Sequence, residues 1–168
     1  MQAVIDSVSM HHLIRSPKLL KKHRRKGNSR IFETSLDRHL KEGRLTLAID
    51  KALGLIDEWK RTCGVECVQV LITCWESFAA IVIIDPVSKI PRSVCHQLSF
   101  MGCIDRLLLR IGMATADRIV VSDDSDFWDP ARPDKRGDPN AKVAKLCKDR
   151  LDITVLLLKT LLVRLRTS

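Results

Sequence analysis

Residues 118–129, RIVVSDDSDFWD, decide the fold, because an apolar stretch here ends in a dense group of acids. The apolar part, 118–122, has the β-branched composition of a buried strand. It follows a helix expected over 103–116, CIDRLLLRIGMATA, whose small residues allow close packing on a sheet. Four aspartates lie within 123–129, and like charges at this density destabilise a fold unless a cation offsets them. The stretch therefore predicts a buried strand that carries carboxylates to the edge of a sheet.

Outward from this point, strands alternate with helices along nearly the whole chain. The apolar patterns predict strands over 3–6, 44–50, 78–84, 118–122 and 153–158 and helices over 7–15, 51–62, 103–116, 141–150 and 159–166. The run 65–72 fits either a strand or a helix, and the prolines of 129–140 indicate a loop. The alternation predicts an α/β fold, a three-layer α/β/α sandwich with a mostly parallel central sheet, as one domain over 1–168.

Several of the expected strands end in acids. They are Asp6, Asp50, Asp85, Asp123, Asp124 and Asp126. The carboxyl ends of parallel strands meet at one edge of a sheet, where ligands usually bind. Carboxylates that gather there raise one another's pKa, and a hard divalent cation such as Mg²⁺ or Mn²⁺ relieves the repulsion. Each acid taken singly also fits a helix cap or an Asx turn.

The charge balance points to a polyanionic partner. Lys and Arg number 29 against 20 Asp and Glu, a formal charge of +9. The basic residues concentrate in the insert 15–30, which has no acid and is either a solvated segment or an arm that binds phosphates. The 4 Phe, 3 Trp and no Tyr are too few for a base-stacking platform. Trp59, Trp75 and Trp128 are expected to be packing groups.

The other patterns indicate a cytoplasmic protein without a membrane partner. Six cysteines without a C-x-x-C motif suggest reduced thiols, and no apolar stretch reaches the length of a membrane span. The histidine pair 11–12 and the cysteines 63, 67 and 74 suggest a zinc site, but the spacing C-x₃-C-x₆-C lacks a convincing fourth ligand. The D-x-D of Asp124 and Asp126 also matches haloacid-dehalogenase phosphatases, but too little chain follows it for their later motifs.

Four stretches resemble PIN-like domains, a family of metal-dependent ribonucleases. VSDDSDFW at 121–128 is similar to their V-[ST]-x-D-x-D-F signature, and the helix over 103–116 is similar to the acidic helix before it. AVIDSVSMHHLI at 3–14 resembles their first strand and helix, and KALGLIDEWKRT at 51–62 resembles the helix that supplies a glutamate. The resemblance extends from residue 3 to about 165, and the basic insert and the run 78–84 enlarge the minimal fold.

Carried over residue by residue, the resemblance implies that the catalytic acids are Asp6, Glu58, Asp105 and Asp124. It implies that Mg²⁺ or Mn²⁺ is held by Asp6, Asp105, Asp124 and Asp126. Asp50 and Asp57 remain alternatives to Glu58 as the helix acid. Ser122 is expected either to hold a carboxylate or a metal-bound water, or simply to end its strand.

The expected activity is hydrolysis of RNA phosphodiester bonds by a metal-activated water. RNA backbone binding is assigned to Lys18, Lys21, Lys22, Arg24, Arg25 and Lys26. One role that the resemblance implies is a toxin of a toxin–antitoxin pair, with a protein antitoxin and a second copy of the chain as partners. A housekeeping or defence nuclease is the other enzymatic role. The competing hypothesis is a non-catalytic PIN-like module that binds RNA or a protein.

Overall fold

Five parallel strands form the central sheet of the computed structural model, which describes residues 1–16, 20–26, 29–129 and 131–167. The strands are β1 (Gln2–Ile5), β4 (Thr46–Asp50), β5 (Ile81–Ile84), β6 (Ile119–Val121) and β7 (Thr154–Leu156). Their order across the sheet is β5-β4-β1-β6-β7, so the first strand of the chain lies in the middle. Each residue from Ala3 to Ile5 pairs with its counterpart in β6, and Ala3 also pairs with Leu47 of β4.

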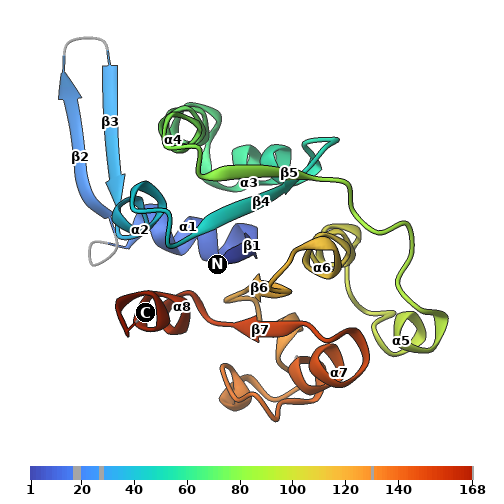
Figure 1. Ribbon diagram of the computed structural model, residues 1–168. Coiled ribbons are helices and arrows are strands. Elements are labelled where there is room, and N and C mark those ends of the chain that lie inside the picture. Colours follow the sequence, from blue (N-terminus) through green and yellow to red (C-terminus); the bar gives the residue numbers. More distant parts are fainter. Residues whose placement is uncertain (17–19, 27–28, 130, 168) are drawn as a thin grey trace.

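Helices cover both faces of this sheet. They are α1 (Ser7–Arg15), α2 (Asp37–Lys41), α3 (Gly54–Cys63), α4 (Val65–Ser77), α5 (Arg92–Gln97), α6 (Cys103–Ala114), α7 (Lys142–Leu151) and α8 (Leu158–Thr167), with 3₁₀ turns η1 (Ser125–Phe127) and η2 (Pro133–Lys135). Helix α3 packs against α1 and α4, whereas α6 and α7 pack on the strands from the other side (Figure 1). The expected three-layer α/β/α sandwich is confirmed, and the run 65–72 is helical.

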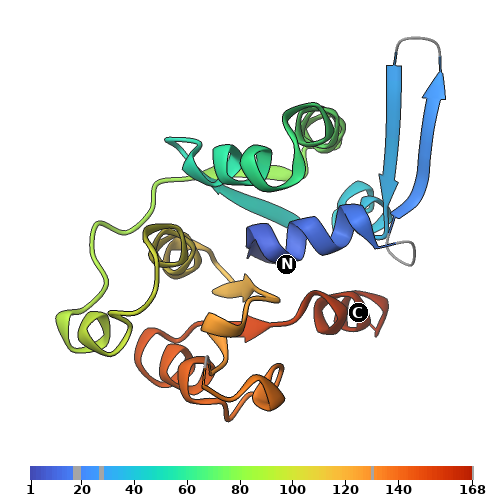
Figure 2. The ribbon, with the colours of Figure 1, turned by 180° about the vertical axis from the view of Figure 1, so that it is seen from behind.

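The basic insert forms a feature that the sequence did not predict. Its backbone folds into an antiparallel hairpin of β2 (Leu20–Lys26) and β3 (Ser29–Thr34), separate from the central sheet. The hairpin projects from the side of the molecule opposite α5 (Figures 1 and 2). Lys18 and the side chains of Lys21, Lys22, Arg24, Arg25 and Lys26 lie outside the described residues. The assignment of these six residues to RNA binding therefore stays a prediction.

A continuous apolar core fills the space between the layers. The central strand is fully buried at Ala3, Val4 and Ile5, as its position in the middle of the sheet requires. Trp59, Trp75 and Trp128 are also buried, which confirms that the tryptophans pack the interior. No helix within the described part of the chain is long and apolar enough to cross a membrane.

Helix α6 lies unusually close to the sheet because residue 112 is a glycine. A Cβ at Gly112 would stand 2.7 Å from Cγ2 of Val120 on β6 and 3.6 Å from Cδ1 of Ile153. Contacts below 3 Å between carbon atoms are repulsive, so the helix axis could not remain where it is with a larger residue. This close approach fixes the position of the N-terminal end of α6, where Asp105 lies.

We predict that Gly112→Val lowers the free energy of unfolding by about 1–3 kcal/mol, because the added carbons overpack the interface between helix and sheet. Urea unfolding followed by circular dichroism measures the change. Ala114→Val, a partly exposed position on the same helix, is the control and should lose much less. Equal losses for the two variants would contradict the close packing at residue 112.

Candidate active site

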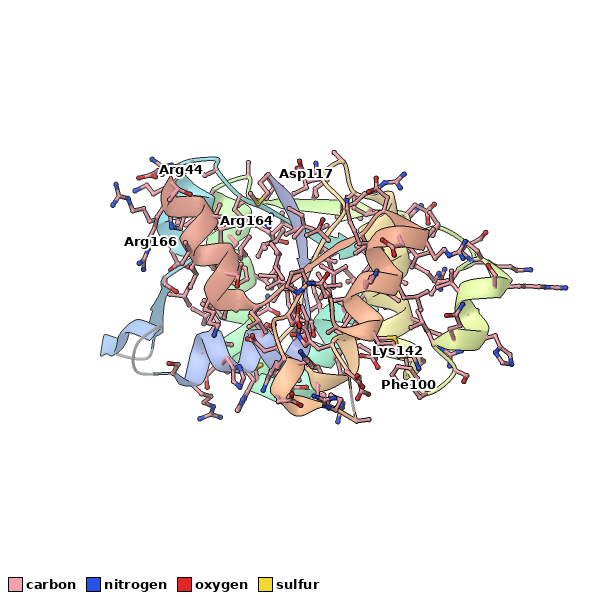
Figure 3. The ribbon with its side chains drawn as sticks, turned by 90° about the horizontal axis from the view of Figure 1, so that it is seen from below. Arg44, Phe100, Asp117, Lys142, Arg164 and Arg166 are labelled. Carbon is pink, nitrogen blue, oxygen red and sulfur yellow. The ribbon has the colours of Figure 1, made fainter. Side chains whose placement is uncertain are left out.

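The candidate site lies at the carboxyl ends of β1 and β6, where the strand order reverses. From β1 the chain adds strands in one direction through β4 and β5, and then in the other through β6 and β7. Open parallel sheets bind ligands in the crevice at such a switch point. Figure 3 shows the two edges. Arg44 and Asp117, which precede β4 and β6, lie along the top, whereas Phe100, which precedes α6, and Lys142, the first residue of α7, lie below.

Asp6 occupies the centre of this edge and is only 3% exposed. It follows β1 and caps α1, where one carboxylate oxygen accepts a hydrogen bond from the backbone N–H of Ser9. The other oxygen accepts a short hydrogen bond from the hydroxyl of Ser122, directly after β6. Burial raises the pKa of Asp6 to about 6, although these hydrogen bonds lower it, and the charge of Asp123 raises it further.

Two serines connect the two strand ends. The Ser122 hydroxyl accepts a hydrogen bond from the backbone N–H of Asp124 at 3.0 Å, in addition to its bond to Asp6. The Ser9 hydroxyl accepts one from the backbone N–H of Asp123 at 2.8 Å. Ser122 thus holds a carboxylate, which is one of its two expected roles. The loop after β6 is consequently fixed relative to the first turn of α1.

Asp123 contacts a second set of groups on the other side of the loop. Its Oδ1 accepts a 3.3 Å hydrogen bond from the backbone N–H of Leu158, at the start of α8, and its Oδ2 lies 3.1 Å from Nδ1 of His12. A cavity of about 430 Å³ lies beside this pair, and Arg136 and Lys159 also line it. Asp123 therefore faces cations, unlike the aspartates that follow it.

The remaining acids form a more open group, which we call the carboxylate cluster. Its members are Glu58 of α3, Asp105 of α6, and Asp124 and Asp126 at the 3₁₀ turn after β6. Burial raises the pKa of Asp105, and the charges of the other three members raise it further. Burial and the charge of Asp124 likewise raise the pKa of Asp126. The four carboxylates therefore lie near enough to repel one another.

Each central aspartate of the cluster is also a structural cap. Oδ2 of Asp105 accepts a hydrogen bond from the backbone N–H of Gly102 at 2.9 Å, and Oδ1 of Asp124 accepts one from Asp126 at 3.1 Å. Within the described residues, the second oxygen of each has no hydrogen-bond donor. One oxygen is thus held by the backbone, and the other is available to a ligand.

The structure separates the three candidates for the helix acid. Asp50 is buried and caps α3, with its two oxygens accepting from Gly54 at 2.9 Å and Leu55 at 2.8 Å. Asp57 points to solvent and lies 3.6 Å from Nζ of Lys60. Glu58 instead faces the site and accepts a 3.4 Å hydrogen bond from the hydroxyl of Ser7, next to Asp6. Asp50 and Asp57 therefore both lie outside the carboxylate cluster.

Glu58 is the one member of the cluster with a basic partner among the described residues. Two nitrogens of Arg61 donate to its carboxylate at 2.6 and 3.0 Å. These bonds lower the pKa of Glu58, although burial raises it. Asp85, after β5, is exposed at the far side of the sheet and is not part of the cluster.

Sequence reasoning missed the polar residues that hold the acids in place. Ser7, Ser9 and His12 lie on the first helix, and each touches an acid of the site. Their i, i+2 and i+5 spacing follows no motif. The available signal was weaker: Ser9 stands three residues after Asp6, as in a capped helix start. Asp123 is among the acids expected at the edge of the sheet, but the resemblance assigns it no role.

Comparison with known proteins identifies no relative. No family model matches the chain, and neither the curated proteins nor the solved structures contain a match. Across the described residues, no group of three His, Cys, Asp or Glu side chains is arranged to hold a metal ion. The function is therefore inferred from the geometry of the site.

We predict that ionisation of Asp6 costs stability in a definite pH range. Because its folded pKa of about 6 exceeds the ordinary value of 3.8, the native state binds more protons than the unfolded state between these pH values, so stability falls as pH rises. The unfolding free energy of the wild type, relative to Asp6→Asn, should fall by roughly 2 kcal/mol between pH 4 and 7. Urea titrations in EDTA measure it, and parallel pH curves for the two proteins would contradict the assignment.

Proposed function

We propose that this protein is a metal-dependent endoribonuclease that uses Mg²⁺ or Mn²⁺. The observation that carries the proposal is the carboxylate cluster at the switch point of the sheet, where burial raises the pKa of Asp105 and the charges of Asp124, Asp126 and Glu58 raise it further. Carboxylates that repel one another lower the stability of the fold. Their presence at an edge where ligands usually bind therefore supports a function for them. The resemblance of 103–128 to the PIN-like acidic motifs supports the same function.

The donor set fits a hard divalent cation. Mg²⁺ and Mn²⁺ prefer carboxylate oxygens, and the free oxygens of Asp105 and Asp124 are of this kind. The proposed ligands are Asp105 and Asp124, with Asp6 behind them and Asp126 at the rim. Mutual repulsion keeps these side chains apart, and a cation removes the repulsion that separates them. When bound, the cation lowers the pKa of a water and neutralises charge on the scissile phosphate.

The residues of the chain have distinct roles in this scheme. Ser122 fixes the orientation of the Asp6 carboxylate, and the Gly102 N–H fixes that of Asp105. Glu58 reaches the site from α3, where its carboxylate is positioned to orient the attacking water, and Arg61 keeps it ionised. No side chain is required as a covalent nucleophile.

RNA is the proposed substrate because the chain carries a formal charge of +9. The toxin role, with a protein antitoxin and a second copy of the chain as partners, is one setting for such an enzyme. A housekeeping or defence nuclease is another. The competing proposal is a non-catalytic RNA-binding or protein-interaction module of the same fold, for which metal-dependent cleavage would be absent.

We predict that the purified protein cleaves mixed RNA in Mn²⁺ or Mg²⁺ and not in EDTA. Asp105→Asn and Asp124→Asn should each reduce the rate by about 100-fold or more, since each removes a proposed cation ligand, a loss of about 2.7 kcal/mol of transition-state stabilisation. Gel analysis of labelled RNA measures the rates.

Asp57→Asn is the matched control, because it removes an equivalent charge from α3 on the solvent side. Its cleavage rate should equal that of the wild type. Cleavage that persists in both site variants would overturn the assignment of the active site. A folded wild type that binds RNA without cleaving it in either metal would favour the non-catalytic module.

A further inference from the structure

A second basic surface lies beside α6, on the side of the molecule opposite the hairpin. It is a groove of about 400 Å³ between the segment 88–95 and α6, and we call it the basic groove. Four cations and two thiols line it: Lys89, Arg92, Arg106, Arg110, Cys95 and Cys103. No acidic residue contributes to the lining, which sets the groove apart from the cavity beside Asp123.

The walls of the groove are joined by backbone contacts. Nε of Arg110 donates to the carbonyl oxygen of Val87 at 2.6 Å, and the N–H of Val87 donates to the carbonyl oxygen of Arg110 at 3.3 Å. Ile90 and Val94 are buried and anchor the same segment on the core. The basic side chains are therefore displayed on a fixed surface, which lowers the entropy lost when a ligand binds.

The positive charge of the groove is not neutralised by the protein. Within the part of the chain that the structure describes, none of the four cations forms an ion pair, whereas Lys60, Arg61 and Lys148 on other helices each pair with a carboxylate. Four neighbouring cations repel one another, and an anion relieves that repulsion. Arginine predominates among them, and its planar fork of donors suits phosphate oxygens.

The basic groove and the carboxylate cluster meet at the N-terminal end of α6. Asp105 belongs to the cluster, and its chain neighbour Arg106 lines the groove, about 100° further around the helix. Arg110 lies one turn further along, about 6 Å away along the axis. A polyanionic chain bound in the groove therefore lies along a single rigid helix that ends at the acids.

We propose that the basic groove binds the phosphodiester backbone of single-stranded RNA and directs it to the carboxylate cluster. This inference rests on the proposed nuclease function and adds the path of the substrate. The path differs from the one that the sequence suggested, because the basic hairpin lies on the other side of the molecule from α5 (Figure 2). Contacts to phosphates give affinity and salt dependence without sequence preference.

The test is binding of a fluorescent single-stranded RNA of mixed sequence, measured by anisotropy in EDTA so that no cleavage occurs. The variant Lys89→Gln, Arg92→Gln, Arg106→Gln removes three groove charges and keeps Arg110, which holds the wall. The plot of log K against log salt should become shallower by about 2, or about 0.7 for each lost phosphate contact.

The matched control removes three charges elsewhere, as Lys41→Gln, Arg164→Gln, Arg166→Gln. Arg164 and Arg166 lie at the end of the molecule away from Phe100, which precedes α6 (Figure 3). This control has the same net charge as the groove variant. Its salt slope should stay within about 0.5 of the wild-type slope if the groove contacts the RNA, because long-range attraction alone is screened beyond about 10 Å.

A thiol of the groove provides an independent readout. Cys103 is exposed, whereas Cys63, Cys67 and Cys147 are buried, so a maleimide should react first in the groove. Saturating RNA in EDTA should slow labelling of Cys103 by about tenfold in the wild type and not in the groove variant. Cys103→Ser identifies the labelled position by loss of the modified peptide in mass spectrometry.

Several outcomes would overturn the proposal. The first is an equal decrease of the salt slope in the groove variant and the control. The second is unchanged labelling of Cys103 in saturating RNA. The third is protection of Cys103 by poly-glutamate but not by RNA, which would assign the groove to an acidic peptide. Failure of the nuclease function is distinguishable, because it appears as absent metal-dependent cleavage while RNA binding and thiol protection in EDTA persist. If the groove variant cleaves RNA normally and keeps the wild-type salt slope, RNA binding by the groove is refuted and the nuclease function is not.

Discussion

The hydrogen bonds to the buried Asp6 carboxylate are the constraint on which the rest of the site depends. One oxygen is bound by the first turn of α1 and the other by Ser122 after β6, so the carboxylate joins the two strands at the switch point. Burial opposes its ionisation and raises its pKa to about 6. A chain selected for stability alone would place an uncharged cap here, since asparagine and serine cap helices equally well. The charge at this buried position supports the proposal of a cation at this edge.

Hydrogen bonds from backbone N–H groups also explain how the fold tolerates several acids in one place. Asp6, Asp105 and Asp124 each accept a hydrogen bond from a backbone N–H at the start of a helix or turn, which offsets part of the repulsion between them. The bond also fixes the direction of each carboxylate. Capping and ligand binding are therefore two uses of one side chain, and for these acids the structural interpretation does not exclude the functional one.

Much of the fold could be predicted from the sequence, because period and composition determine which segments are buried. The strand and helix around 103–122 follow from apolar runs, and the parallel sheet follows from the alternation of strands with helices, whereas the order of the strands was not predicted. The hairpin of the insert could not be predicted, since LKKHRRK has no apolar alternation and its strands pair only with each other. In the site, Asp6, Asp124 and Asp126 are predicted because they follow strands, whereas Glu58 and Asp105 are assigned only through the resemblance to PIN-like motifs. The role of His12 and the basic groove depend on contacts between distant segments and leave no local signal.

The central claim is that the carboxylate cluster binds a divalent cation, and anomalous diffraction from crystals soaked in Mn²⁺ tests it most directly. We expect one anomalous peak bounded by Asp105 and Asp124, about 2.0–2.2 Å from their oxygens, a range taken from small octahedral cations. The oxygen of each aspartate that has no backbone donor should face the peak. A peak elsewhere, or none at saturating Mn²⁺ in crystals with an open site, would contradict the account.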